Sequence, residues 1–180
     1  MIGWAMPVLV SIAVPAIGEA DRAAIAVRVA DFGAMMQEGR IADSLDFIPP
    51  RLLRSIAQRF GVPENDVKAM VGAQMANALA GVRFLSFAMD MQAATVATTP
   101  GRRRAYMLIP TESQIAIPDL GTLRSQTSTL ALQDEGEWYL IRIDSTQQVA
   151  LLRAAYPEFT GVDFPSGSST MVDGPVPTPP

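Results

Sequence analysis

The stretch that decides the fold runs from Val82 to Asp144 and reads VRFLSFAMDMQAATVATTPGRRRAYMLIPTESQIAIPDLGTLRSQTSTLALQDEGEWYLIRID. Its four runs are rich in β-branched, aromatic and Met residues, a composition typical of β-strands. Three turn signals separate the runs: Pro100-Gly101, Asp119-Leu120-Gly121 and Asp134-Glu135-Gly136. This spacing predicts a four-stranded antiparallel sheet. Pro110, inside the second run, indicates a bulge or an edge interruption.

The last two runs predict a hairpin whose two faces are both apolar. Asp134-Glu135-Gly136 is typical of a three-residue loop with Gly136 in the left-handed conformation, which pairs Gln133 with Glu137. One face then carries Leu130, Leu132, Trp138 and Leu140, and the other Ala131, Tyr139, Ile141 and Ile143. Because the expected helices cover one face only, the outer face is a candidate homodimer surface.

Three helices are expected before the sheet and a short one after it. Apolar residues recur at helical spacing from Asp21 to Glu38. Pro49-Pro50 opens a second helix that ends before Gly61, and Pro63 opens a third, whose apolar face includes Met residues interpreted as core filler. The fourth covers Gln147 to Ala155. The predicted class is α+β, with three N-terminal helices on a curved sheet around a pocket.

The amino terminus predicts export. Residues 2–17 are almost entirely apolar, and Gly18-Glu19-Ala20 offers small residues where a signal peptidase cuts. No Lys or Arg precedes the apolar run, so a retained anchor or a buried helix is the alternative, and a membrane partner follows only if the segment is retained. The division is therefore a signal peptide or anchor at 1–20, one domain at 21–165 and a disordered Pro/Gly/Ser tail at 166–180. The expected location is periplasmic or otherwise exported.

Composition excludes several kinds of chemistry. The chain has 180 residues, 49% of them hydrophobic and 18% charged, which suits one globular domain. A net charge of −4 argues against a nucleic-acid partner. Because histidine and cysteine are absent, no Ser-His-Asp or Cys-His system and no thiolate or imidazole metal site can form. We therefore expect no metal and no cofactor.

The order of these features resembles a known superfamily. The shared features are Ile48-Pro49-Pro50, Ile109-Pro110-Thr111, the hairpin from Leu130 to Asp144, and the closing Tyr156-Pro157 and Phe164-Pro165. Together they resemble uncharacterised extracytoplasmic proteins of the NTF2-like, or cystatin-like, superfamily. The resemblance implies a cone of sheet and helices around a pocket. It implies no catalytic residue, because no motif of the family's enzymes aligns with this chain.

Five residues are candidates for a site. Asp90 lies between two Met residues, and a buried carboxylate there would make a general base, with Tyr106 or Tyr139 as hydrogen-bond donor. The alternation of Ser86, Ala88 and Asp90 favours instead a solvated polar face. Arg124 and Arg142 lie on neighbouring strands and are candidate ligands for an anion, against the alternative of surface ion pairs with Glu112 or Glu137. The basic run at residues 102–104 is interpreted as a solvated turn.

The expected function is a non-enzymatic, exported domain that binds a partner protein or a small apolar ligand. The alternative is a cofactor-free isomerase, dehydratase or epoxide hydrolase, acting on a small apolar substrate in the cone pocket. That alternative requires Asp90 and either Tyr106 or Tyr139 to meet in one pocket.

Overall fold

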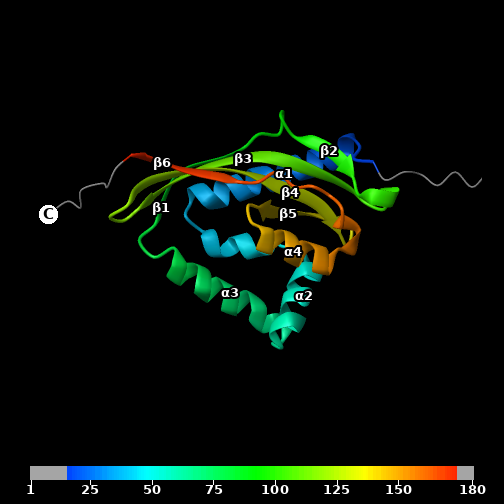
Figure 1. Cartoon of the computed structure of the whole chain (residues 1–180), viewed down its shortest axis with the longest axis horizontal. Coiled ribbons are helices and arrows are strands. Elements are labelled where there is room, and N and C mark those ends of the chain that lie inside the picture. Colours follow the sequence, from blue (N-terminus) through cyan, green and yellow to red (C-terminus); the bar gives the residue numbers. More distant parts are fainter. Residues whose placement is uncertain (1–15, 174–180) are drawn as a thin grey trace, which may run out of the picture.

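The computed structural model describes residues 16–173, so most of the predicted signal segment lies outside the described residues. The elements are α1 (Glu19–Gln37), the 3-10 helix η1 (Ile41–Phe47), α2 (Pro50–Phe60), α3 (Glu64–Ala78), β1 (Arg83–Met89), β2 (Thr95–Thr98), the 3-10 turn η2 (Pro100–Arg102), β3 (Ala105–Ile117), β4 (Gly121–Asp134), β5 (Glu137–Ile143), α4 (Thr146–Ala155), the 3-10 turn η3 (Pro157–Phe159) and β6 (Ser168–Asp173). The α+β class is confirmed, and the antiparallel sheet curls strongly into a half-barrel (Figure 1).

The long hairpin of β3 and β4 is the centre of the sheet. β1 and β2 each pair with β3 and follow one another along the same side of it. β5 and β6 likewise follow one another along the side of β4 that faces away from β3. The predicted number of four strands is therefore wrong, because the sheet has six. The first predicted run divides into β1 and β2. β6 comes from a segment predicted to be disordered, so the ordered domain extends past residue 165.

On β3, Pro110 lies opposite the gap between the end of β1 and the start of β2. Its carbonyl accepts a hydrogen bond from the backbone N–H of Asp90 at 2.8 Å, and its nitrogen, which faces the same neighbour, has no proton to donate. The chain loops out over residues 90–94 and returns as β2. The Asp90 carboxylate closes this loop, accepting from the N–H groups of Gln92 and Ala93 at 2.9 and 3.0 Å. The predicted edge interruption at Pro110 is confirmed.

The hairpin between β4 and β5 is tighter than predicted. Asp134 pairs with Glu137, so the loop consists of Glu135 and Gly136 alone. Their φ angles are 50° and 89°, as a type I′ turn requires, and this turn matches the twist of the flanking strands. The predicted three-residue loop, with Gln133 opposite Glu137, is wrong by one residue.

This one-residue difference changes how the hairpin side chains are sorted. We name the two faces of the sheet after the helix that covers each. In the hairpin, the α4 face carries Leu130, Leu132, Tyr139, Ile141 and Ile143, and the α1 face carries Ala131, Trp138 and Leu140. The predicted grouping of Trp138 with Leu130 is wrong, because a shift of one residue moves a side chain to the opposite face.

Helices of the same chain cover both faces. On the α4 face, Leu130 and Ile141 pack in one cluster with Leu52 of α2, Leu152 of α4 and Phe159 of η3. A second cluster on the α1 face joins core residues of β3, β4 and β5 to the helix, and its members include Ile25, Met35, Met107, Ala131 and Leu140. α1 contacts β1 and β5, at opposite ends of the strand order, as expected when a sheet curls around a helix.

The dimer surface was predicted on the assumption that one apolar face of the sheet stays uncovered, and the structure does not meet that assumption. Trp138 and Leu140 on one face, and Ile141 and Ile143 on the other, are all less than 9% exposed within a single chain. No uncovered apolar face is left on this hairpin. A homodimer stays a prediction, but it needs a different surface.

α3 stands apart from the sheet. It contacts α2 and η1 and lies away from the sheet in Figure 1. Of its apolar residues only Val67 is buried, while Met70 is 39% exposed. The interpretation of its methionines as core filler therefore fails for Met70. Met75 is half-buried, and its sulfur accepts a hydrogen bond from the Ser44 hydroxyl.

Candidate functional site

A surface depression of about 460 Å³ lies where β1, β3 and β4 run side by side. The depression is on the α4 face, but α4 does not cover this part of it, so the sheet is open to solvent there. Its lining comprises Ser86, Ala88, Asp90, Pro110, Thr111, Glu112, Gln126 and Thr127. The two carboxylates, the Ser86 hydroxyl and the Gln126 amide are on this face, whereas the side chains of Thr111 and Thr127 alternate to the α1 face. The depression presents hydrogen-bond acceptors and net negative charge.

The strand alternation that forms this face was predicted correctly. Ser86, Ala88 and Asp90 are exposed, whereas Phe87 and Met89, between them, pack in the core on the α1 face. The expectation that Asp90 lies on a solvated face is therefore confirmed. Its Oδ1 already accepts two backbone hydrogen bonds from the loop after β1, so the structural role of this carboxylate is to close that loop.

Glu112 is the centre of a side-chain network at the edge of the depression. The Arg124 guanidinium donates to its Oε2 at 2.7 Å, and the Gln126 amide donates to the same oxygen at 3.3 Å. The hydrogen bond from Arg124 lowers the pKa of Glu112, and the one from Gln126 contributes. Glu112 is therefore held ionised and oriented, as an acceptor for a ligand should be.

Arg124 and Arg142 do not converge on one site. Arg124 and Gln126 are two residues apart on β4, so both are on the α4 face. Thr129 is an odd number of residues after Arg124 and is therefore on the α1 face. Arg142 of β5 lies opposite Thr129 and shares that face. Arg142 pairs with Asp144 at 2.8 Å, not with Glu137. The two arginines face opposite sides of the sheet and cannot hold the same anion. The predicted ion pair of Arg124 with Glu112 is confirmed.

Asp90 is also separated from both tyrosines with which it could form a catalytic pair. Tyr106 is buried on the α4 face, with its ring against Phe159 at 5.3 Å between centroids, and burial raises its pKa. Tyr139 lies on β5, on the far side of β4 from Tyr106. Asp90 is beside Pro110, four residues along β3 from Tyr106, or about 13 Å at the usual rise per residue. Neither tyrosine lines the depression that contains Asp90.

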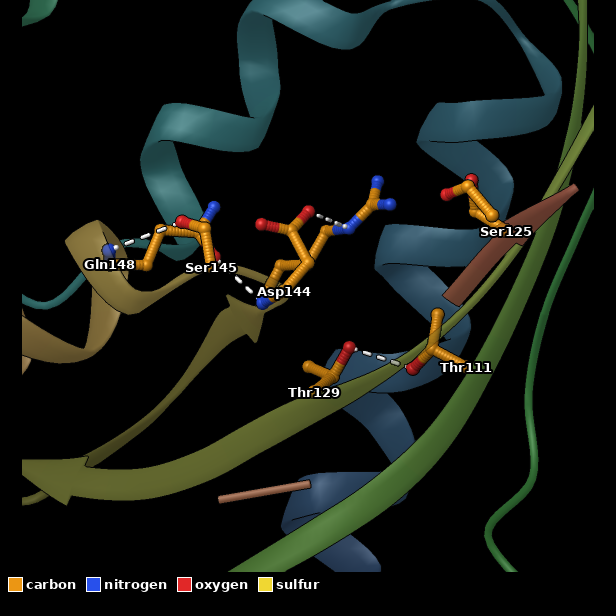
Figure 2. A network of polar contacts seen from close by, with 8 residues as sticks. Thr111, Ser125, Thr129, Asp144, Ser145 and Gln148 are labelled. Carbon is orange, nitrogen blue, oxygen red and sulfur yellow. Dashed lines mark hydrogen bonds and ion pairs between the residues drawn. The ribbon is translucent and has the colours of Figure 1, made fainter. Parts of the chain in front are cut away.

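Hydroxyl side chains cross the α1 face of the two central strands. The hydroxyls of Thr111 and Thr129 are 2.8 Å apart, and Figure 2 shows the two side chains turned toward each other. The hydroxyl of Ser125 on β4 lies 2.9 Å from that of Ser169 on β6. These pairs satisfy polar groups that the sheet buries, which is their structural role.

Charged side chains that the sequence did not point to surround the buried ring of Tyr156. The ring of Tyr156 is fully buried, and the guanidinium carbons of Arg51 and Arg104 lie 5.0 and 5.1 Å from its centroid. Asp134, which is 8% exposed, accepts from the backbone N–H of Arg51. Arg104 donates to Glu158 at 2.8 Å and to the carbonyl of Gln133.

This cluster shifts two ionisation equilibria. Burial raises the pKa of Tyr156, and the neighbouring charge of Asp134 raises it further. Burial also works to raise the pKa of Glu158, but hydrogen bonds from its own backbone and from Arg104 outweigh it, so that pKa is lowered. The Tyr156 hydroxyl has no hydrogen-bond partner in the described part of the chain. Arg104 was interpreted as part of a solvated turn, and that is wrong.

No signal in the sequence marks Arg104 as different from its neighbours. Arg102 and Arg103 are exposed, as the solvated-turn interpretation requires, and only the third arginine of the run turns inward. Its partner Glu158 lies 54 residues further along the chain. A pairing of that kind is visible only in three dimensions.

A second depression, of about 310 Å³, lies at the start of α4. It is bounded by the end of β5, the first turn of α4 and the segment that leads into β6. Figure 2 shows the polar contacts at this helix start, where the Gln148 side chain accepts from the backbone N–H of Asp144 and Ser145 caps the helix. These contacts complete the helix terminus, which is their structural role.

Two further findings limit the chemistry of residues 16–173. No cluster of three or more acidic side chains in this range is placed to hold a metal ion. None of the helices in the same range is both long enough and apolar enough to cross a membrane.

The fold and its surface together define an α+β domain with a half-barrel sheet, a filled interior and a polar depression on the open part of one face. Comparison with protein-family models, with curated proteins and with solved structures finds no match for this chain. The resemblance to the NTF2-like superfamily therefore stays a prediction.

Proposed function

We propose that this chain is a non-enzymatic binding domain, and that the depression on the open sheet face binds a small ligand rich in hydrogen-bond donors, such as an amine or a polyol. The observation that carries the proposal is the lining of that depression. Two carboxylates, Asp90 and Glu112, lie there with the Ser86 hydroxyl and the Gln126 amide, and the nearby cation Arg124 is already paired with Glu112.

The ligand class follows from what the lining offers. Ionised carboxylates accept hydrogen bonds and attract positive charge, and hydroxyls accept or donate. The surface is an open sheet face, which gives a ligand less apolar contact than an enclosed pocket does. The ligand proposed here is therefore polar, in place of the small apolar molecule expected from a cone pocket. The filled α1 face supports this choice, since α1 and the core residues occupy the space a cone pocket would need.

A binding role is preferred to catalysis because the residues proposed for catalysis lie apart. A general base acts within hydrogen-bonding reach of the proton that it removes. Asp90 lies in the depression, while Tyr106 is buried against Phe159. A substrate that touches one does not reach the other.

Export is part of the same proposal and rests on the sequence alone. The expected cleavage point after Ala20 lies in the first turn of α1, which begins at Glu19. The backbone N–H of Gly18 donates to the Asp21 carboxylate at 3.0 Å, and Ile17 packs against the core on the α1 face. N-terminal sequencing of the protein from its own host tests both the cleavage and its position.

The first experiment on binding is native mass spectrometry of protein purified from its own host, compared with the denatured spectrum. A non-covalent adduct of a small polar molecule supports the proposal. The second experiment titrates ¹⁵N-labelled protein with putrescine and, separately, with glycerol, glucose and inositol. We expect amide shifts at Ala88, Glu112 and Gln126.

A matched pair of variants assigns the site. Glu112→Gln removes the central acceptor charge and is expected to weaken putrescine binding about tenfold. Glu38→Gln removes an exposed carboxylate just past the end of α1, and binding should be unchanged. No adduct together with no amide shift for any of the four compounds, or shifts confined to other regions, would overturn the proposal.

A further inference from the structure

β6 is held to the rest of the molecule almost entirely by its backbone ladder. It pairs with β4 between Thr122 and Gln126, and β4 is the element with which it makes its extensive contact. No residue of β6 belongs to the described core clusters. Met171 and Val172 are 50% and 48% exposed. A strand that buries so little apolar surface opens locally at a small fraction of the global unfolding free energy.

The chain before β6 is anchored to the core through Phe164, and Gly167 then lies close against Thr127 and Asp144. The carbonyl of Val162 accepts from the Arg153 guanidinium at 2.8 Å, and Val162 is buried. The ring of Phe164 lies 6.0 Å from that of Phe159, against the core of the α4 face. Residues 165–167 then connect the anchor to β6. Three extended residues span about 10 Å, enough to carry a strand away from its own sheet.

We propose that β6 of one copy pairs with β4 of a second copy, which gives a strand-exchanged homodimer. When β6 leaves, residues 122–126 of β4 expose an unpaired backbone edge, and such edges bind extended segments by strand addition. A short connection after a fixed anchor is the usual setting for exchange of an identical element between copies.

The occupant is a second copy of this chain because the seated strand is already matched to the edge. Ser169 lies opposite Ser125 with their hydroxyls 2.9 Å apart, and Thr170 lies opposite Arg124, so no like charges face each other. A second copy supplies the same contacts in the same register. This route to a dimer uses a strand edge instead of the covered sheet faces.

Exchange would also place the second copy beside the depression. Gln126, which lines the depression and donates to Glu112, pairs with Ser168 of β6. In the exchanged dimer that neighbour comes from the other chain. The inference does not depend on the ligand, and its test contains none, so the two proposals can fail separately.

The absence of cysteine from the chain permits a direct test with the full-length protein. Ser125→Cys and Ser169→Cys are prepared as two separate single variants, mixed, incubated at high concentration and then oxidised. Ser125 is 6% exposed and its hydroxyl contacts that of Ser169 on β6, so we expect its thiol to become accessible when β6 opens. We expect interchain disulfide between the two variants on a non-reducing gel.

The matched control measures random collision of thiols. Glu112→Cys and Gln126→Cys also lie opposite each other, on β3 and β4, but neither of these central strands can leave the fold. We expect the Ser125/Ser169 mixture to give at least ten times as much interchain disulfide as the Glu112/Gln126 mixture. Equal amounts from the two mixtures would overturn the proposal.

The double variant S125C/S169C checks the starting point. At low concentration it should form an intrachain disulfide and migrate as a monomer, because the strand is seated in its own sheet. If the double variant forms no disulfide, β6 is not seated in this register and the proposal falls.

Discussion

The backbone N–H of Asp90 donates to the carbonyl of Pro110 at 2.8 Å, and this contact marks the place where one edge of the sheet breaks. The break needs both residues. Pro110 supplies no donor to continue the ladder, and the Asp90 side chain accepts from the N–H groups of Gln92 and Ala93, which have no strand partner. An aspartate that resembles a catalytic base in sequence is therefore a loop-closing residue.

Asp90→Ala should destabilise the protein by about 1 kcal/mol, because two backbone donors lose their acceptor. Asp90→Asn keeps an oxygen at the same position and should cost less than half as much. Urea unfolding of the two variants and the wild type measures the difference. Equal losses for the two variants would show that the charge, and not the acceptor, is what matters.

Tyr156→Phe should leave the free energy of unfolding unchanged or raise it by about 1 kcal/mol. Among the described residues, the buried Tyr156 hydroxyl has the Asp134 carboxylate as a polar neighbour but makes no hydrogen bond of full geometry, so removing it relieves desolvation at little cost in hydrogen bonding. Thermal and urea unfolding would detect the change. A loss of more than 1 kcal/mol would mean that the hydroxyl has a partner, and Asp134 is the first residue to test by mutation.

Stability should fall in acid partly through Glu158. Its pKa in the folded protein is lowered from an ordinary value of 4.5, so the unfolded chain binds the proton more readily. Its contribution is therefore present above about pH 4.5 and is lost as the pH falls through the folded-state pKa. Urea unfolding from pH 7 to pH 3 measures this loss, and Glu158→Gln should reduce the slope.

At neutral pH, Glu158→Gln should cost about 2 kcal/mol. Its side chain is 14% exposed and that of Arg104 is 21% exposed, so the pair is only partly screened by water. The matched control is Glu38→Gln, since Glu38 pairs with Arg40 in full contact with solvent. That change should alter the free energy of unfolding by less than about 0.5 kcal/mol. Similar losses for both would contradict the role of burial.

Glu135→Asn should stabilise the β4–β5 hairpin by about 0.5 kcal/mol. Glu135 has a φ of 50°, a conformation that asparagine adopts with less strain, and its ion pair with Arg54 is exposed. Gly136→Ala, at a φ of 89°, should destabilise by about 1 kcal/mol or more. Thermal unfolding of both variants tests whether the first raises and the second lowers the stability of the protein.

Local sequence signals predicted most of the elements. Gly61 ends α2 in the left-handed conformation as expected, and Pro110 marks the edge interruption. Asp134-Glu135-Gly136 placed the turn but gave the wrong register, because Asp-Glu-Gly suits a two-residue loop as well as a three-residue one. The error reversed which face Trp138 occupies. The reasoning about a dimer surface failed for a different reason, because helices of the same chain cover both faces.

The contacts that the sequence did not predict are those between distant segments. The segment from 165 to 180 that contains β6 has the Ser, Gly and Pro content of a tail, and β6 is ordered because β4 offers it an edge. Arg104 looks like its exposed neighbours until Glu158 is placed beside it. For the candidate site, alternation predicted the exposure of Asp90, but not the depression or the network around Glu112. Arg124 and Arg142 looked like neighbours because alternation shows which residues of one strand share a face, but not how the residues of two strands align.

The end-to-end arrangement of the edge strands has a consequence for the order of folding. β3 and β4 are adjacent in sequence and joined by a short turn, so their pairing closes a small loop and is entropically easy. β1, β2, β5 and β6 each pair with one part of that hairpin, and α1 must still meet β5 across most of the chain. We expect the β3–β4 hairpin to act as a template on which the two edges assemble. Pulse-labelled hydrogen exchange during refolding should protect the amides of β3 and β4 before those of β6.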